Sequence, residues 1–256
     1  MSLPEIVTAE EWRAARVALL AEEKAMTRAR DALNTRRRQL PMVRIEKDYR
    51  FEGPERSGGA GTGGSDGQVG LLDLFEGRRQ LMVGHFMFDP EWEDGCPSCT
   101  AGAEEMSDGL RDHLHTRDTT LAYVSRAPFP KIQVYKAKKG WTFPWYSSFG
   151  SSFNYDFHVT VDPAVAPVEY NYRDQAALEA ADPAWVGWSG EQPGLSCFLR
   201  VGDQVFHTYS QYARGAESTG GSYSFLDLTA LGRQEEWEEP KGRADSARAA
   251  TPDFAN

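Results

Sequence analysis

The chain has 256 residues, of which 40% are hydrophobic and 12% aromatic, enough to build the core of one globular domain with extensions. Its formal net charge of −10 argues against nonspecific binding to nucleic acid, because that binding requires Lys and Arg to neutralise phosphates. No stretch reaches transmembrane length, the first residues lack a basic segment followed by an apolar run, and three cysteines are too few for a secreted disulfide scaffold. We therefore expect a cytoplasmic protein with no membrane or nucleic-acid partner.

Residues 1–41 predict an N-terminal helical extension. Thr8-Ala-Glu-Glu11 fits a capping box that opens a helix, which runs to about Arg38 before Pro41 stops it. The acidic start and the basic end agree with the helix dipole. The apolar side is imperfectly periodic and consists of Trp12, Val17, Leu19, Leu20, Met26 and Leu33. Such a helix either packs on the rest of the chain or pairs with a second copy in a homodimer.

Two further segments precede the main domain. The run from Val43 to Phe51 alternates well enough to predict a first strand. Residues 53–70 are rich in glycine and serine, which predicts a flexible surface loop. The glycines are not a phosphate-binding motif, because no Gly-Lys-Ser/Thr follows and no strand-to-helix turn surrounds them.

The motif Cys96-Pro97-Ser98-Cys99 carries most of the chemical information in the chain. It follows an apolar, aromatic run from Leu81 to Phe88 that predicts a buried strand, and it precedes a helical pattern from Ala101 to His115. A cysteine at a helix N-terminus faces unpaired N–H groups and the positive end of the dipole, which favour thiolate over thiol. We therefore expect Cys96 to be the nucleophile and Cys99, one turn later, the resolving thiol of a redox dithiol.

Two other interpretations of these cysteines stay open. In the first of these, Cys96 and Cys99 supply half of the ligands of a structural metal site. Such a site would need two more ligands from Cys197 and the five histidines. No second C-x-x-C and no H-x-x-x-H is present. In the second interpretation, the two cysteines have no chemical role and only pack in the interior, since free cysteines are commonly buried. The strand-then-helix context favours the redox dithiol.

The segments after the dithiol predict the rest of a sheet. Residues 119–125 are β-rich, residues 128–139 carry a helical face, and residues 143–147 return as an extended segment, which makes a second β-α-β step. Strands flanking Gly202-Asp203 predict an antiparallel hairpin, and Ser222 to Leu231 a closing helix. The predicted fold class is therefore α/β with the thioredoxin-like fold, a central mixed sheet flanked by helices.

This thioredoxin-like domain is expected to span residues 42–234. Residues 153–193 form an insertion before the C-terminal hairpin, either an extra hairpin or flap beside the dithiol or a cover for an edge strand. Residues 235–256 are polar and lack apolar periodicity, so we expect a disordered or loosely docked tail.

Four further residues are supporting candidates. Trp92 precedes the dithiol loop and is placed to line the approach to Cys96. Arg126 follows the second core strand, at the sheet edge where α/β proteins place their sites, and either supports a thiolate or anionic substrate or makes a surface salt bridge. His207 lies on a hairpin strand with Tyr209 on the same expected face. Pro193 lies near the place of the cis-proline of thioredoxins, but is separated from the hairpin strand.

Six runs of the chain form a specific pattern: Gly84-His-Phe-Met-Phe-Asp-Pro-Glu-Trp92, Gly95-Cys-Pro-Ser-Cys99, Val124-Ser-Arg-Ala-Pro128, Gly140-Trp-Thr-Phe-Pro-Trp145, Phe206-His-Thr-Tyr-Ser-Gln-Tyr-Ala-Arg-Gly215 and Tyr223-Ser-Phe-Leu-Asp-Leu228. In these runs the chain resembles the bacterial DUF899 family, which is grouped with thioredoxin-like proteins and for which dithiol-disulfide oxidoreductase activity is proposed. The resemblance covers roughly Leu3 to Glu236. The resemblance implies the fold more firmly than the activity.

The expected function is thiol-disulfide exchange with a thiol or disulfide substrate, protein or small molecule, and with no bound cofactor. Pro97 and Ser98 influence its reduction potential through the pKa of Cys96. The alternatives are peroxiredoxin-like peroxide reduction, which lacks its Pro-x-x-x-Thr-x-x-Cys motif here, copper or zinc binding by Cys96 and Cys99 with a histidine, and a binding module with a vestigial dithiol.

Overall fold

The computed structural model describes residues 3–54 and 68–242. Most of the predicted glycine-rich loop and the end of the predicted tail, residues 55–67 and 243–256, lie outside the described residues. The described residues fall into two compact units, one with residues 3–41 and 222–242 and one with residues 42–54 and 68–221. Among them no helix is both long enough and apolar enough to cross a membrane.

The smaller unit contains the predicted N-terminal helix, α1 (Ala9–Arg38). Its capping box is present: the Thr8 hydroxyl accepts from the Glu11 N–H at 3.2 Å, and the Thr8 N–H donates to the Glu11 carboxylate at 2.9 Å. The expected closing helix is shorter than predicted, α7 (Ser222–Leu226), and it belongs to this unit rather than to the sheet unit.

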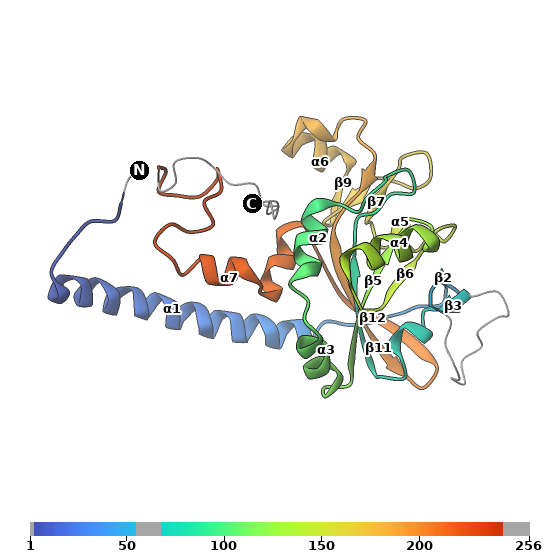
Figure 1. Cartoon of the computed structure of the whole chain (residues 1–256), viewed down its shortest axis with the longest axis horizontal. Helices are drawn as coiled ribbons and strands as arrows, with labels where there is room; N and C mark the ends of the chain where they lie inside the picture. Colours follow the sequence, from blue (N-terminus) through green and yellow to red (C-terminus); the bar gives the residue numbers. More distant parts are fainter. Residues whose placement is uncertain (1–2, 55–67, 243–256) are drawn as a thin grey trace. The chain divides into compact units, whose positions relative to one another are not determined.

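The larger unit is built on an eight-stranded mixed sheet in the order β1-β12-β11-β4-β5-β6-β2-β3. Figure 1 shows several of these strands, among them β5, β6, β11 and β12. Strands β4, β5 and β6 are parallel, while β11 and β12 form an antiparallel hairpin whose first strand pairs with β4. The strands are β1 (Val43–Arg44), β2 (Arg50–Glu52), β3 (Gln68–Gly70), β4 (Gln80–His85), β5 (Thr119–Ser125), β6 (Trp145–Ser147), β11 (Gly194–Val201) and β12 (Gln204–Tyr212). The run β12-β11-β4-β5, with its helix after β4, is the thioredoxin-like core, so the predicted fold class is confirmed.

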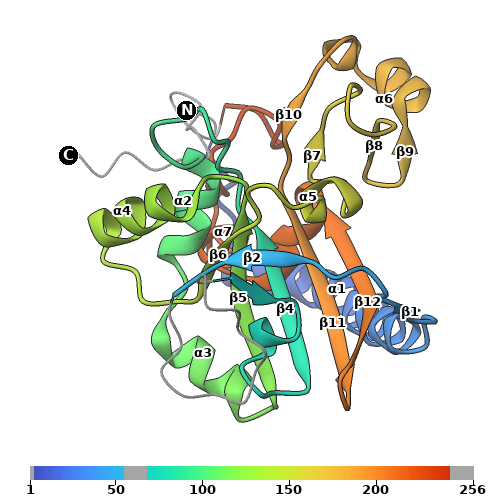
Figure 2. The ribbon, with the colours of Figure 1, turned by 90° about the vertical axis from the view of Figure 1, so that its right-hand side faces the viewer.

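The helices after β4 and β5 gather on one side of these central strands (Figure 2). They are α2 (Pro97–Glu104), α3 (Asp108–His115) and α4 (Phe129–Lys139). Ala103 of α2 and Ile132 and Tyr135 of α4 join Phe86 and Trp145 in a buried cluster. A second, larger cluster includes Phe51, Phe75, Phe153, Phe157 and Phe198. The first cluster fixes α2, and with it the dithiol, beside the end of β4.

Two sequence predictions of single elements are wrong in detail. The helical pattern from Ala101 to His115 is two helices, because Ser107 caps the second one by accepting from the Leu110 N–H at 3.1 Å. The expected strand from Val43 to Phe51 is also divided: β1 pairs with β12 at one edge of the sheet, and β2 pairs with β6 and β3 toward the other.

The insertion of residues 153–193 forms short elements with two small pairings of its own. Strand β7 (Thr160–Val161) pairs with β10 (Gly190–Glu191), and β8 (Glu169–Tyr170) forms a hairpin with β9 (Arg173–Asp174). It also contains two helices, α5 (Phe153–Asp156) and α6 (Gln175–Ala181), and the 3-10 turn Pro183–Trp185. Two further 3-10 turns, Asp73–Phe75 and Ala213–Thr219, lie outside it.

Gly84 in β4 supplies the first testable prediction. A Cβ atom there would lie 2.5 Å from Cε1 of Tyr123, whose ring packs edge-on against Phe143 at 4.9 Å between centroids. We expect Gly84→Ala to lower the free energy of unfolding by about 1–3 kcal/mol, the usual cost of overpacking a core. Chemical denaturation measures the change. The control is Gly102→Ala in α2, where the new Cβ meets open space and a gain of up to about 1 kcal/mol is expected. Equal stability of Gly84→Ala and the native protein would contradict this account.

Candidate functional site

Cys96 is the N-cap residue of α2, with Pro97 at the first helical position. Its N–H donates to the Met87 carbonyl at 2.9 Å, which ties the helix start to the segment leaving β4. Its carbonyl accepts from both the N–H and the hydroxyl of Thr100, each at 2.9 Å. The same Thr100 hydroxyl is hydrogen-bonded to the Tyr135 hydroxyl of α4 at 2.8 Å. The backbone that carries the first cysteine is therefore held from both sides.

The two thiols of the motif have different environments. A hydrogen bond from the Cys99 thiol is the largest cause that lowers the pKa of Cys96 to about 6. Burial opposes it as the second-largest effect, and the N–H groups of Cys99 and Ser98 each lower the pKa further. That same hydrogen bond, together with burial and the Cys96 charge, raises the pKa of Cys99 well above its ordinary value. Cys99 packs on the aromatic cluster behind α2. At neutral pH the arrangement favours a Cys96 thiolate next to a protonated Cys99.

Arg126 lies at the end of β5 and binds two carboxylates and a phenol. Its Nε donates to Glu191 of β10 at 2.6 Å, one Nη to Asp89 at 2.8 Å, and the other Nη to the Tyr155 hydroxyl at 2.6 Å. Glu191 has a side chain only 1% exposed and also accepts from the Thr160 hydroxyl at 3.0 Å. Asp89 belongs to the segment between β4 and the dithiol. Arg126 therefore connects the insertion to the dithiol loop, instead of facing a thiolate or substrate alone.

A chain of hydrogen bonds between polar side chains runs across strands β4, β11 and β12. Nε2 of His85 is hydrogen-bonded to the Ser196 hydroxyl at 2.8 Å, Ser196 to the Ser210 hydroxyl at 2.8 Å, and Ser210 to Nε2 of His207 at 2.7 Å. His85 is buried and lies against Phe153, and burial lowers its pKa to about 3, so the ring is neutral at physiological pH. Burial also lowers the pKa of His207. These contacts stabilise the sheet, and they indicate a structural role for His207.

The expected shared face of His207 and Tyr209 is wrong. A β-bulge shifts the register between Cys197 and Phe198: Cys197 is opposite Tyr209, Phe198 is opposite His207, and Thr208 is the extra residue between them. Because one extra residue reverses the alternation of a strand, His207 and Ser210 share a face and Tyr209 points to the opposite one.

The remaining sequence candidates lie as follows. The Pro193 carbonyl accepts from the Tyr170 hydroxyl at 3.0 Å, and in the described part of the chain the only cis peptide bond is Glu239-Pro240, so Pro193 lacks the cis geometry of thioredoxins. Trp92 is 39% exposed, and its carbonyl accepts from the Lys131 ammonium at 2.7 Å. Burial raises the pKa of Cys197 to about 11, which makes it a poor nucleophile.

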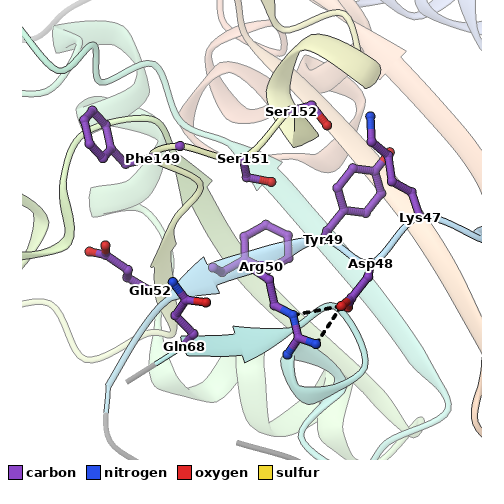
Figure 3. A pocket seen from close by; sticks show the side chains of 11 residues that line it. Lys47, Asp48, Tyr49, Arg50, Glu52, Gln68, Phe149, Ser151 and Ser152 are labelled. Atoms are coloured by element: carbon purple, nitrogen blue, oxygen red, sulfur yellow. Dashed lines mark hydrogen bonds and ion pairs between the residues drawn. The ribbon is translucent and has the colours of Figure 1, made fainter. Parts of the chain in front are cut away.

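In the described chain, neither a group of side chains able to hold a metal ion nor the pocket beside β2 involves the dithiol. Within residues 3–54 and 68–242 no group of three or more His, Cys, Asp or Glu side chains is arranged to hold a metal ion. A pocket of about 340 Å³ lies beside β2 and the turn before α5 (Figure 3). There Arg50 is bonded to Asp48, at 2.6 Å for one Nη, and Lys47 to Asp156 at 2.7 Å, so the cations present are paired within the chain.

Sequence reasoning missed the partners of the site residues. Asp89 carried a signal, since it follows the first core strand at the same sheet edge as Arg126. Glu191 and Tyr155 carried none, because they lie in an insertion without motif or periodicity. Ser196 and Ser210 lie opposite each other only because the bulge shifts the register of the hairpin. The sequence pattern does not predict that bulge.

A thioredoxin-like core with a C-x-x-C motif at the first turn of the helix after its first strand defines the class of thioredoxin-like dithiol proteins. Within that class, the chain belongs to the family described as "Bacterial protein of unknown function (DUF899)", whose model matches residues 1–249. The resemblance noted in the sequence is thereby confirmed. No curated protein matches the chain.

Solved structures with a similar course of the chain are distant. Peroxiredoxin Q of Xanthomonas campestris, as a cysteine-to-serine mutant, is 13% identical with a TM-score of 0.42, covering 70% of this chain and 93% of that one. Peroxidoxin BcpB of Mycobacterium tuberculosis is 11% identical with a TM-score of 0.40, covering 68% and 86%. The bacterioferritin comigratory protein of Xanthomonas campestris, described for its alkyl peroxide reduction activity, is 14% identical with a TM-score of 0.38, covering 59% and 81%.

The Arg126 contacts predict a pH-dependent loss of stability in Arg126→Met. Removal of the guanidinium leaves the Glu191 carboxylate buried without its cation, which should lower the free energy of unfolding by about 3 kcal/mol at pH 8. This value is the lower end for a broken buried ion pair, because the Arg126 side chain is 21% exposed. Burial raises the pKa of Glu191 above its ordinary value, so protonation stabilises the folded state as pH falls. The cost should therefore shrink at pH 5, as measured by urea unfolding.

The double variant Arg126→Met with Glu191→Gln is the matched control. It lacks the buried carboxylate, so its stability relative to the native protein should change less between pH 5 and pH 8. An equal loss of stability in Arg126→Met at both pH values would show that the buried carboxylate is not the cause.

Proposed function

We propose that this protein catalyses thiol-disulfide exchange, with Cys96 as the nucleophile and Cys99 as the resolving thiol. The observation that carries the proposal is the position of Cys96 at the N-cap of α2, where two backbone N–H groups and the Cys99 thiol stabilise its thiolate. A thiolate is the attacking species in exchange, and a pKa near the ambient pH gives the best balance of thiolate fraction and nucleophilicity.

The reaction balances without a cofactor. The Cys96 thiolate attacks one sulfur of a substrate disulfide, a new S–S bond forms to that sulfur, and the other substrate sulfur leaves as a thiolate that takes up a proton. Cys99 then loses its proton and attacks Cys96, which releases the second substrate thiol and leaves a Cys96–Cys99 disulfide. The substrate gains two electrons and the dithiol loses two. A second thiol, from a protein or a small molecule, returns the dithiol to its reduced form.

The raised pKa of Cys99 has a role in this sequence. In the reduced protein Cys99 stays protonated and donates to Cys96, so only one of the two sulfurs competes for the substrate. Once Cys96 is part of a mixed disulfide, its negative charge and its acceptor for that hydrogen bond are gone. Both changes lower the cost of ionising Cys99 at the moment when its attack is needed.

The other candidate functions have weaker support. Peroxide reduction would use the same thiolate, but Arg126, the arginine expected to support a thiolate, already binds Asp89 and Glu191. Copper or zinc binding would need a third ligand, and in the described chain no histidine joins Cys96 and Cys99 in such a group. A vestigial dithiol would show an ordinary thiol pKa at Cys96.

A redox titration tests the proposal directly. The protein, with metal removed, is equilibrated in glutathione buffers of stepped ratio, and free thiols are counted by mass spectrometry. We expect one two-electron transition that is absent in both Cys96→Ser and Cys99→Ser, because each lacks one sulfur of the pair. Absence of a transition in the native protein, or its appearance only in the presence of metal, would refute the oxidoreductase proposal. Parallel assays with hydrogen peroxide distinguish exchange from peroxide reduction.

The hydrogen bond between the thiols gives a separate prediction. The rate of Cys96 alkylation by iodoacetamide should rise with pH around a midpoint of about 6. Cys99→Ala removes the donor, so the midpoint should move up toward the ordinary thiol value of about 8.5. Cys99→Ser keeps an O–H donor and should shift it less. Identical midpoints in all three proteins would mean that the Cys99 side chain does not stabilise the thiolate.

A further inference from the structure

Helix α1 is long and has no buried residue. Its 30 residues extend for about 45 Å, and none of them is buried in the chain. Most helices in proteins are stabilised by packing of an apolar face, since intrinsic propensity alone leaves them marginal in water. Residues 222–242 belong to the same compact unit, yet the large apolar side chains of α1 remain exposed. Within its own unit, residues 3–41 and 222–242, the helix therefore presents an apolar face that the described residues leave uncovered.

The exposed side chains form a line with a strict seven-residue repeat. Trp12, Leu19, Met26 and Leu33 are 61%, 50%, 65% and 41% exposed. Leu40, directly after the helix, continues the repeat and is 50% exposed. Residues repeated at seven stay on one side of a helix only when it supercoils around a partner, which is the pattern of a coiled-coil seam.

Small residues lie along one flank of this seam. On this flank, alanines stand one residue before or three residues after the large side chains. On the other flank, charged residues stand four residues after them. The alanines are Ala15, Ala18, Ala25, Ala29 and Ala32, and the charged residues are Arg16, Glu23, Arg30 and Arg37. The charged residues on the alanine side are Glu22 in the middle of the helix and Glu11 and Arg36 at its two ends. A row of alanines lets a second helix approach closely, and large side chains of the partner fill the space that the alanines leave.

The charges of the helix ends select the direction of the partner. Glu10 and Glu11 lie in the first turn, and Arg36, Arg37 and Arg38 in the last. Two such helices side by side in parallel would place like charges together at both ends. In the antiparallel direction the acidic first turn of each lies level with the basic last turn of the other, and the helix dipoles also oppose.

We propose that α1 pairs antiparallel with α1 of a second copy of this chain. With residue n of one helix level with residue 48 − n of the other, Leu19 lies level with Ala29 and Leu33 with Ala15, so these two leucines meet small side chains. Trp12 lies level with Arg36 and Met26 with Glu22. In this register Ala25 lies near the twofold axis, and Ala18 of one copy lies near Ala32 of the other. The interface thus uses a part of the chain distinct from the dithiol.

Sedimentation of the full-length protein at micromolar concentration tests the pairing. We expect a dimer for the native protein and for Val17→Glu, whose side chain lies on the side of the helix away from the seam. The double variant Leu19→Glu with Met26→Glu places charges in the seam and should raise the dimer dissociation constant by about 100-fold or more. A monomeric native protein, or an undisturbed dimer in the seam variant, would overturn the proposal.

Cross-linking tests direction without relying on a disruptive variant. In a background with Cys96, Cys99 and Cys197 changed to Ser, Ala25→Cys should form a disulfide between two copies under mild oxidation. Ala18→Cys should not cross-link with itself but should do so when mixed with Ala32→Cys. Efficient self-cross-linking of Ala18→Cys would indicate a parallel pair, and no cross-linking at any of these positions would indicate a different partner. Either result would refute the antiparallel pair.

Discussion

The hydrogen bond from the Cys96 N–H to the Met87 carbonyl fixes where α2 begins, and the chemistry proposed for this chain depends on that point. A helix has free N–H groups only in its first turn, so a shift of one residue in the helix start would take the Cys96 sulfur away from the donors of Ser98 and Cys99. Thr100 and Tyr135 hold the same turn from the side of α4. The Cys96 thiolate is therefore favoured first by the Cys99 thiol and then by the backbone N–H groups of Cys99 and Ser98, all of which the start of α2 holds in place.

Arg126 shows why a charged residue at the functional edge of a sheet need not touch the substrate. Its guanidinium is shared between Asp89, Glu191 and Tyr155, which belong to the dithiol loop and to the insertion. Two carboxylates face one cation, and burial raises the pKa of Glu191 even beside Arg126. The cluster therefore holds two chain segments together. When both carboxylates are ionised, the group formed by Arg126, Asp89 and Glu191 carries a net negative charge.

The sequence predicted the features that depend on local patterns. The capping box of α1, the strand-dithiol-helix order, the hairpin at Gly202-Asp203 and the thioredoxin-like strand order all follow from spacing and turn chemistry. The division of the helix at Ser107 was missed because the apolar spacing continues across the break. Contacts between segments far apart in the chain, such as Arg126 with Glu191, depend on the path of an insertion that no motif describes. Local physical chemistry thus set the framework, while long-range packing decided which side chains meet.

The bulge in β12 has a consequence for how this hairpin tolerates change. Thr208 is the extra residue that turns Ser210 and Tyr212 to the same face as His207. Loss of that one residue would send every later side chain of the strand to the opposite face, while replacement of its side chain would leave the alternation intact. Strand length at this point is therefore constrained more tightly than residue identity, so related chains should vary here by substitution and not by deletion.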